Sequence, residues 1–130
     1  MKFGLSAEAR LHSPRQFDLI FRTGHRQTGR LVRLLFFESP TIDSTRFGVT
    51  VSKKIANAVK RVRGRRILRE AIRRLKPWVK DGFWIVVSLR GAGLDVSARE
   101  IYFDLAKLMK RQDLLVSEWQ NLDWDVDTTR

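Results

Sequence analysis

The chain contains no cysteine, only two histidines and no long apolar run. The absence of cysteine excludes disulfides and thiolate chemistry, and His12 and His25 alone cannot form a zinc site of the usual kind. No stretch approaches the roughly 18 to 20 apolar residues that span a bilayer. The first ten residues, MKFGLSAEAR, lack the apolar core of a signal peptide. We therefore expect a cytoplasmic protein whose side chains hold no metal and no cofactor.

Acidic residues are scarce as well. Asp and Glu number 14 against 26 Lys and Arg, which gives a formal charge of +12. Such a domain repels itself unless a polyanion neutralises it, so nucleic acid is the leading partner and an anionic membrane surface the second. The charge is also concentrated, because eleven bases and one acid lie in 53–76, whereas four acids and one base lie in 114–130.

Apolar periodicity and capping signals predict a single domain of α+β class with the order α-β-β-α-β-α. The first helix begins at Pro14 after a Ser13 and Gln16 capping box, and the last begins after a Ser97 and Glu100 box. The predicted elements are a helix over 14–23, strands over 30–38 and 46–52, a basic helix over 57–75 ended by Pro77, a strand over 83–90 and a helix to about 111. We expect the first two strands to be antiparallel neighbours, the domain to occupy 1–112, and 113–130 to form an acidic, mobile tail.

The basic helix has one face for packing and one for charge. A helical wheel gathers the apolar residues in one arc and the arginines elsewhere; the arc holds Gly64, Ile67, Leu68, Ala71, Ile72 and Leu75. A merely solvated basic face is the alternative, but like charges three or four positions apart repel and only Glu70 relieves them. Arginine forks match phosphate oxygens, which favours nucleic-acid binding without distinguishing DNA from RNA.

Read with its neighbours, this segment resembles the signature of the bacterial ribonuclease P protein subunit. The stretch RFGVTVSKKIANAVKRVRGRRILREAIRR, 46–74, matches the family's V-S-K-K turn and its A-V-x-R-N-R-x-K-R-x-x-R-E helix. Weaker similarity runs from about Arg10 to Arg111. Three departures stand out: Val62 replaces the signature Asn, Gly64 replaces a larger apolar residue, which permits a closer approach of helix and sheet, and Leu35 replaces an aromatic residue.

The resemblance implies a single-domain α/β sandwich with a mostly antiparallel sheet, in which the arginine helix forms a left-handed β-α-β crossover. It also implies a subunit of an endoribonuclease holoenzyme that removes the 5′ leader of precursor tRNA and leaves a 5′-phosphate. Catalysis would reside in the RNA subunit with its Mg²⁺, and the chain would act as a monomer in a 1:1 complex with that RNA, without a membrane. No catalytic constellation appears among the protein side chains.

Two surfaces follow from the resemblance. The residues expected to bind the RNA subunit are Lys53, Lys54, Lys60, Arg61, Arg63, Arg65, Arg66, Arg69 and Arg73. The residues expected to line a leader-binding cleft are Phe17, Phe21, Arg33, Thr50, Ser52 and Arg90, with Ser88 on the same strand face. Core packing is the alternative for both Phe residues, and helical spacing favours it for Phe21.

Three rival functions are compatible with the same composition and charge. A ribosomal protein would also be small, basic, cysteine-free and mixed α/β. An autonomous nuclease would need activity without RNA, and a DNA-binding protein would prefer duplex DNA over a leader at matched salt.

Overall fold

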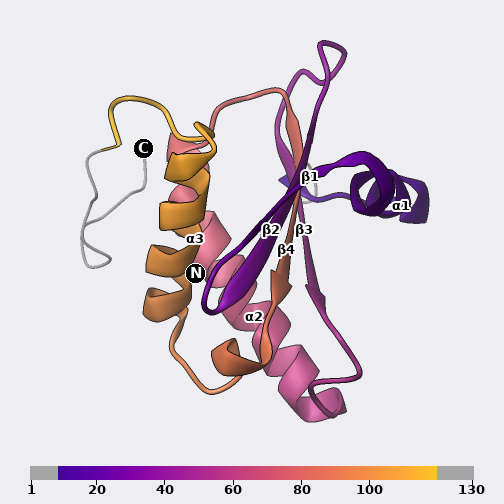
Figure 1. Ribbon diagram of the computed structural model, residues 1–130, viewed down its shortest axis with the longest axis vertical. Coiled ribbons are helices and arrows are strands. Elements are labelled where there is room, and N and C mark those ends of the chain that lie inside the picture. Colours follow the sequence, from indigo (N-terminus) through magenta and orange to yellow (C-terminus); the bar gives the residue numbers. More distant parts are fainter. Residues whose placement is uncertain (1–8, 120–130) are drawn as a thin grey trace.

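The computed structural model describes residues 9–119, which fold into a four-stranded mixed sheet between helices (Figure 1). The helices are α1 (Pro14–Thr23), α2 (Ala58–Leu75) and α3 (Ala98–Arg111), with short 3-10 turns η2 (Lys76–Trp78) and η3 (Gly91–Gly93). The strands are β1 (His25–Thr28), β2 (Val32–Glu38), β3 (Arg46–Val51) and β4 (Phe83–Leu89). The α+β class is therefore confirmed.

The strand order is β1-β2-β4-β3, so the predicted pairing of β2 with β3 is wrong. β4 pairs antiparallel with β2 and parallel with β3, with α2 as the connection between the two parallel strands. The reason lies in β4, whose residues are buried on both sides of the sheet; they include Phe83, Ile85, Val86, Val87 and Leu89. A strand with buried apolar residues on both faces suits an interior position in the sheet better than an edge.

β1 was not predicted because its sequence, HRQT, carries no apolar alternation. It pairs only with β2, as an edge strand, and three of its four residues are exposed. A polar edge strand discourages pairing with other chains, so its composition fits its place.

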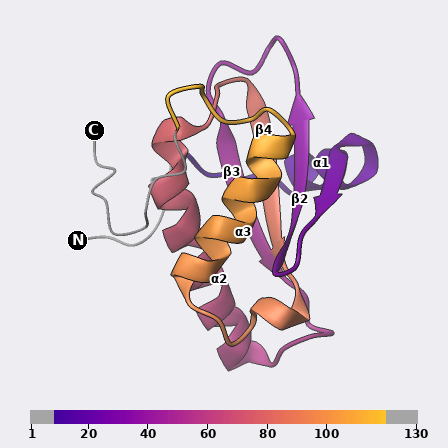
Figure 2. The same ribbon diagram turned by 60° about the vertical axis from the view of Figure 1, so that its left-hand side comes forward.

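The helices lie on opposite faces of the sheet. α2 and α3 cover one face side by side, whereas α1 lies alone on the other (Figures 1 and 2). The larger core therefore lies between the sheet and the helix pair. The smaller core joins α1 to the other face and contains Leu11, Ile20, Leu35 and Val86.

Local signals set the helix ends. Both predicted capping boxes form, at Ser13 with Gln16 and at Ser97 with Glu100. Asn57 caps α2 by accepting a hydrogen bond of 2.9 Å from the Lys60 amide. α2 ends at Leu75, two residues before Pro77, as predicted.

The folded part extends beyond the predicted domain boundary at residue 112. Leu114, Leu115 and Trp119 are buried, and Leu115 forms an antiparallel bridge with Val79. The first part of the predicted acidic tail is thus packed on the core. Its remainder, 120–130, lies outside the described residues.

Candidate nucleic-acid interface

α2 is held against the sheet by its predicted apolar arc. Gly64, Leu68, Ala71, Ile72 and Leu75 are all buried. A Cβ on Gly64 would lie 3.0 Å from side-chain carbons of Val51 and Leu89, so the glycine lets the helix approach β3 and β4 closely. The opposite side of α2 is left for charged residues.

The cations predicted to bind RNA are not equally available. Lys53 and Lys54 in the turn before α2, and Lys60, Arg63 and Arg66 on the helix, are exposed. The others are half-buried: Arg61, Arg65, Arg69 and Arg73. The exposed set therefore forms the outer part of this surface, which we call the α2 surface.

Arg63 also connects α2 to the segment between β4 and α3. Its guanidinium donates hydrogen bonds to the carbonyl oxygens of Leu94, at 2.5 Å, and Val96, at 3.1 Å. Arg61 similarly donates to the Ala56 carbonyl oxygen at 3.0 Å. Both arginines thus fix the backbone around the N-terminal half of α2.

Arg73 lies at the other end of α2 and is engaged by an acid. Glu70 accepts hydrogen bonds from Arg73, at 2.9 and 3.3 Å, and from Arg74, at 3.1 Å. Burial by itself would raise the pKa of Glu70, but the hydrogen bonds and charges of the two arginines outweigh it and lower that pKa. Arg73 is therefore the least available of the cations predicted to bind RNA.

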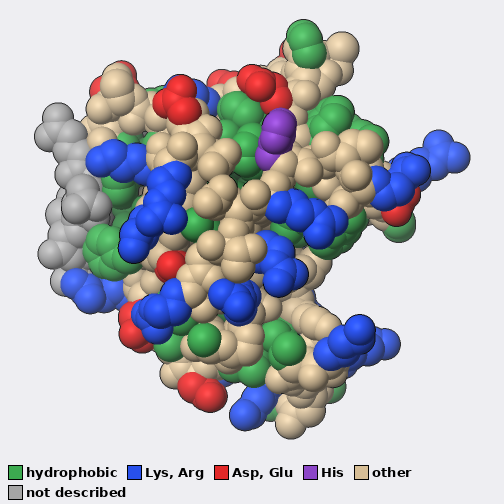
Figure 3. Space-filling view, in the orientation of Figure 1, with side chains coloured by type: hydrophobic (Ala, Val, Ile, Leu, Met, Phe, Trp, Pro, Cys, Tyr) green, Lys and Arg blue, Asp and Glu red, His purple; other side chains and the backbone are tan. Residues whose placement is uncertain are grey.

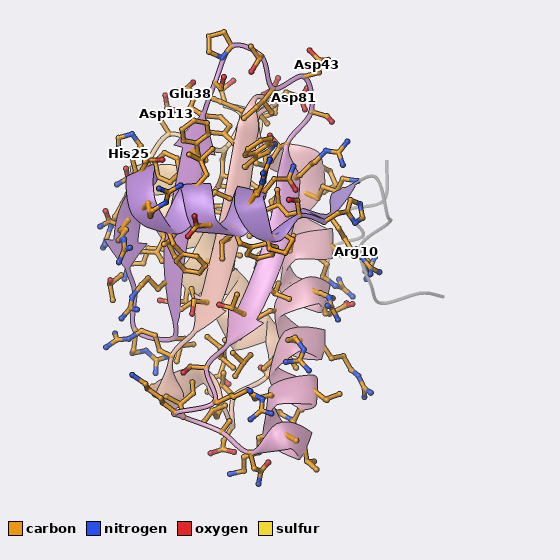
Figure 4. All side chains as sticks on the ribbon, turned by 90° about the vertical axis from the view of Figure 1, so that its right-hand side faces the viewer. Arg10, His25, Glu38, Asp43, Asp81 and Asp113 are labelled. Atoms are coloured by element: carbon orange, nitrogen blue, oxygen red, sulfur yellow. The ribbon has the colours of Figure 1, made fainter. Side chains whose placement is uncertain are left out.

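The second surface is a polar row across the open part of the sheet. The pairing register places Arg33 opposite Thr28 on β1 and Ser88 on β4, and Ser88 opposite Thr50 on β3. Arg33 is exposed and Ser88 and Thr50 are half-buried, because α1 packs over neighbouring rows instead. Figure 4 shows α1 crossing the strands and leaving the other end of the sheet uncovered.

This uncovered part of the sheet is the floor of a cleft. Figure 3 shows the molecule hollowed on its right-hand side, below α1, with Lys and Arg side chains on both margins. Arg90, at the end of β4, is exposed and donates a hydrogen bond of 2.6 Å to the Gly29 carbonyl oxygen. Ser52, also exposed, accepts a hydrogen bond of 3.1 Å from the Lys54 amide.

The two aromatic residues of α1 differ in exposure. Phe17 is half-buried and packs on the smaller core, directly above Gly48 of β3. Phe21 is 37% exposed, so the core packing that helical spacing favoured for it is wrong. Of the two, Phe21 has the more accessible ring and Phe17 the more closely packed one.

Arg10 joins the two surfaces, and the sequence analysis missed it. The backbone beside it continues the sheet, because Arg10 bridges Phe47 in parallel and the Leu11 amide donates to the Phe47 carbonyl oxygen at 2.9 Å. Arg10, Phe17 and Arg69 line a pocket of about 80 Å³ at the β3 edge; Figure 4 labels Arg10 beside α2. Burial, Arg10 and Arg65 lower the pKa of Arg69. No motif marks Arg10, since it lies outside the elements recognised from the sequence.

Across 9–119, no three His, Asp or Glu side chains gather in a way that would hold a metal ion. Among the helices described there, none is long and apolar enough to cross a membrane.

Fold and surfaces together define a small, basic α+β protein with a cationic helix beside an open sheet. The sequence profile of the family Ribonuclease P matches residues 5–113. A Ribonuclease P protein component from Rippkaea orientalis is 35% identical over 117 residues, covering 86% of this chain and 92% of its own.

Solved structures of ribonuclease P proteins have a similar fold. The RNase P protein from Thermotoga maritima superposes with a TM-score of 0.70 at 32% identity, covering 78% of this chain and 96% of that one. The RNase P protein from Staphylococcus aureus gives a TM-score of 0.73 at 27% identity, covering 83% and 98%. The chain belongs to the ribonuclease P protein family, which confirms the resemblance seen in 46–74.

Proposed function

We propose that the chain is the protein subunit of ribonuclease P, which binds the catalytic RNA and the 5′ leader of precursor tRNA and assists removal of that leader. Membership of the family supports the subunit role. The observation that carries the finer proposal is the meeting of two cationic surfaces, the α2 surface and the cleft, at the β3 edge.

The α2 surface is assigned to the RNA subunit. Its exposed cations, Lys53, Lys54, Lys60 and Arg66, are accessible to phosphates. Arg63 presents a different case, because its guanidinium already holds the carbonyl oxygens of the 94–96 segment. Guanidinium groups carry five donors, so Arg63 can fix this backbone and still approach a phosphate.

The cleft is assigned to the leader. A single-stranded leader can stack a base on Phe21 or Phe17 while Arg33 and Arg90 follow its phosphates. The hydroxyls of Thr50 and Ser88 lie in the same row and can hydrogen-bond to sugar or base edges. The arrangement suits an unpaired strand better than a duplex, since stacking requires unpaired bases.

The chemical step is assigned to the RNA. Hydrolysis of the phosphodiester bond leaves a 5′-phosphate on the mature tRNA, and Mg²⁺ bound by the RNA supplies the charge stabilisation. The described protein residues lack a clustered carboxylate site for such an ion. They contribute by holding two polyanions together, so their help is greatest where Mg²⁺ is scarce. We place the complex in the cytoplasm, with one protein per RNA.

The test is cleavage of a precursor tRNA by a bacterial ribonuclease P RNA at low Mg²⁺, with and without this protein, beside the protein alone. Cleavage at the mature 5′ end only when both are present is expected. Arg66→Ala should weaken binding of the RNA subunit, whereas Phe21→Ala should weaken binding of the leader-bearing substrate alone. Cleavage that is unaffected by the protein would instead favour a general RNA-binding protein, such as a ribosomal one.

A further inference from the structure

The outer side of α3 carries a groove that neither proposed RNA-binding surface uses. It has a volume of about 570 Å³ and is lined by Phe103, Lys107, Lys110, Arg111 and Trp119. The Lys110 ammonium lies 5.8 Å from the centre of the Trp119 ring. The groove therefore combines aromatic walls with three positive charges.

These charges have no acidic partner among the described residues. The ion pairs within 9–119 involve Asp18, Glu70 and Asp113, and none of them reaches Lys107, Lys110 or Arg111. All three basic residues are exposed. An occupant that fits this groove must supply both carboxylates and apolar side chains.

The chain itself continues from this groove. Trp119 is the last described residue and forms part of the groove wall. The sequence that follows, NLDWDVD at 121–127, alternates apolar with acidic residues. In an extended conformation, alternate side chains point to opposite sides, which separates three apolar side chains from three carboxylates.

The segment after Trp119 is long enough to extend along the α3 groove. Six residues of extended chain span up to roughly 20 Å, whereas the helical rise from Lys107 to Arg111 is only about 6 Å. The segment is also tethered beside the groove, which raises its effective concentration to the millimolar range or above, about that of a short flexible linker. A free acidic peptide would lack this advantage.

We propose that the acidic segment 121–127 docks in the α3 groove, with its carboxylates paired to Lys107, Lys110 and Arg111. Leu122, Trp124 and Val126 pack on the aromatic walls. Docking on α3 keeps these carboxylates away from the arginines of α2, where they would compete with RNA. The inference does not depend on the proposed function, because it concerns contacts within one chain.

The absence of cysteine allows a direct test. The double variant Lys107→Cys with Asp125→Cys keeps two of the three carboxylates and two of the three basic residues. Mild oxidation should form an intramolecular disulfide between the two new cysteines. Such a bond requires the two Cα atoms to come within about 7 Å. The matched control, Arg66→Cys with Asp125→Cys, places the first thiol on the exposed side of α2 and should oxidise at least tenfold more slowly. Peptide mapping by mass spectrometry identifies each bond.

A second measurement needs no cysteine. Truncation of the chain after Gln120 should shift the backbone amide NMR signals of Phe103, Lys107 and Lys110 and leave those of Lys60 and Arg66 unchanged. Equal oxidation of the two cysteine pairs, a disulfide formed only between two chains, or unshifted α3 amides would each overturn the proposal. Protection of Lys107 from acylation by added RNA, with no disulfide to Asp125, would assign the groove to RNA and overturn it too.

Discussion

Glu70 shows how a single residue makes a strongly basic helix possible. It is buried among arginines and offers its two oxygens to Arg73 and Arg74, so it offsets repulsion at the end of α2 where the helix meets the core. The sequence predicts only that Glu70 relieves the repulsion among neighbouring basic residues of the helix. The structure adds that its carboxylate is buried, which makes its loss costly.

We expect Glu70→Gln to lower the free energy of unfolding by about 1–3 kcal/mol at neutral pH, because charge-assisted hydrogen bonds are lost. Since the folded state lowers the pKa of Glu70, its stabilisation is present above the ordinary value of 4.5 and disappears as pH falls through the folded value. Urea unfolding of the parent protein and of Glu70→Gln at pH 7 and at pH 3 measures how this stabilisation depends on pH. The difference in stability between the two proteins should be smaller at the lower pH.

The control is Asp18→Asn, which breaks the ion pair of Asp18 with Arg22. Both side chains there are about two-thirds exposed, at 64% and 68%. Solvent screens such pairs, so its effect should stay below about 0.5 kcal/mol at neutral pH. An equal loss in both variants would contradict a special role for Glu70.

Gly48 determines the position of Phe17. A Cβ at this site would lie 2.4 Å from the Phe17 ring, so Gly48→Ala must displace the ring from the sheet. We expect weaker leader binding, by up to about tenfold, because a displaced ring loses base stacking. Fluorescence titration with a labelled leader and with the RNA subunit separates the two affinities; the second should be unchanged.

Gly91→Ala is the matched control for this prediction, since a Cβ there has no atom within 4 Å. It should leave both affinities at the level of the parent protein. Parallel losses of leader and RNA-subunit affinity in Gly48→Ala would indicate general unfolding rather than displacement of Phe17.

At the scale of elements, α2 is both a binding surface and a support for its neighbours. Arg63 and Arg66 lie on the same exposed side, but only Arg63 holds the 94–96 backbone. The family signature predicts the same role, binding of the RNA subunit, for both arginines. Their different contacts appear only when the segment before α3 is folded against α2.

This difference predicts distinct effects for two similar substitutions. Arg63→Ala should lower both RNA affinity and the free energy of unfolding, the latter by about 1 kcal/mol for the lost hydrogen bonds. Arg66→Ala should lower RNA affinity alone. Thermal unfolding combined with filter binding distinguishes the cases, and equal stability of the two variants would contradict the supporting role of Arg63.

Elements with local signals could be predicted, and elements that depend on distant partners could not. The capping boxes at Ser13 and Ser97 and the stop before Pro77 set three helix boundaries from neighbouring residues alone. β1 and the position of β4 between β2 and β3 depend on pairing across the chain. The family resemblance supplied the candidate cleft residues, which stay a prediction, whereas Arg10 lies beside Phe17 and Arg69 because its backbone bridges β3.

At the scale of the whole molecule, charge is divided between surfaces. The chain carries +12, yet Glu70 occupies Arg73 and Arg74, and several other arginines hold backbone carbonyls. Only part of the formal charge is thus available to phosphates. The number of available cations determines how steeply binding depends on salt.

We expect the logarithm of the association constant for the RNA subunit to fall linearly with the logarithm of salt concentration. Arg66→Ala should make that slope shallower by about one unit, because one phosphate contact is lost. Lys76→Ala, at the exposed C-terminal end of α2, serves as a comparison outside the predicted contact set and should leave the slope unchanged. Equal slopes for Arg66→Ala and the parent protein would remove Arg66 from the interface.

The parallel pairing of β3 with β4 also fixes an order of assembly during synthesis. β1 and β2 can form a hairpin as soon as both have been made, whereas β3 has a single strand neighbour, and that strand follows α2 in the chain. Apart from the bridge to Arg10, β3 therefore lacks a partner until the arginine segment and β4 have left the ribosome and the chain has turned back. A nascent chain that stops before Phe83 would display the arginines without the sheet that orients them, so the binding surface and the closed sheet are completed in one step.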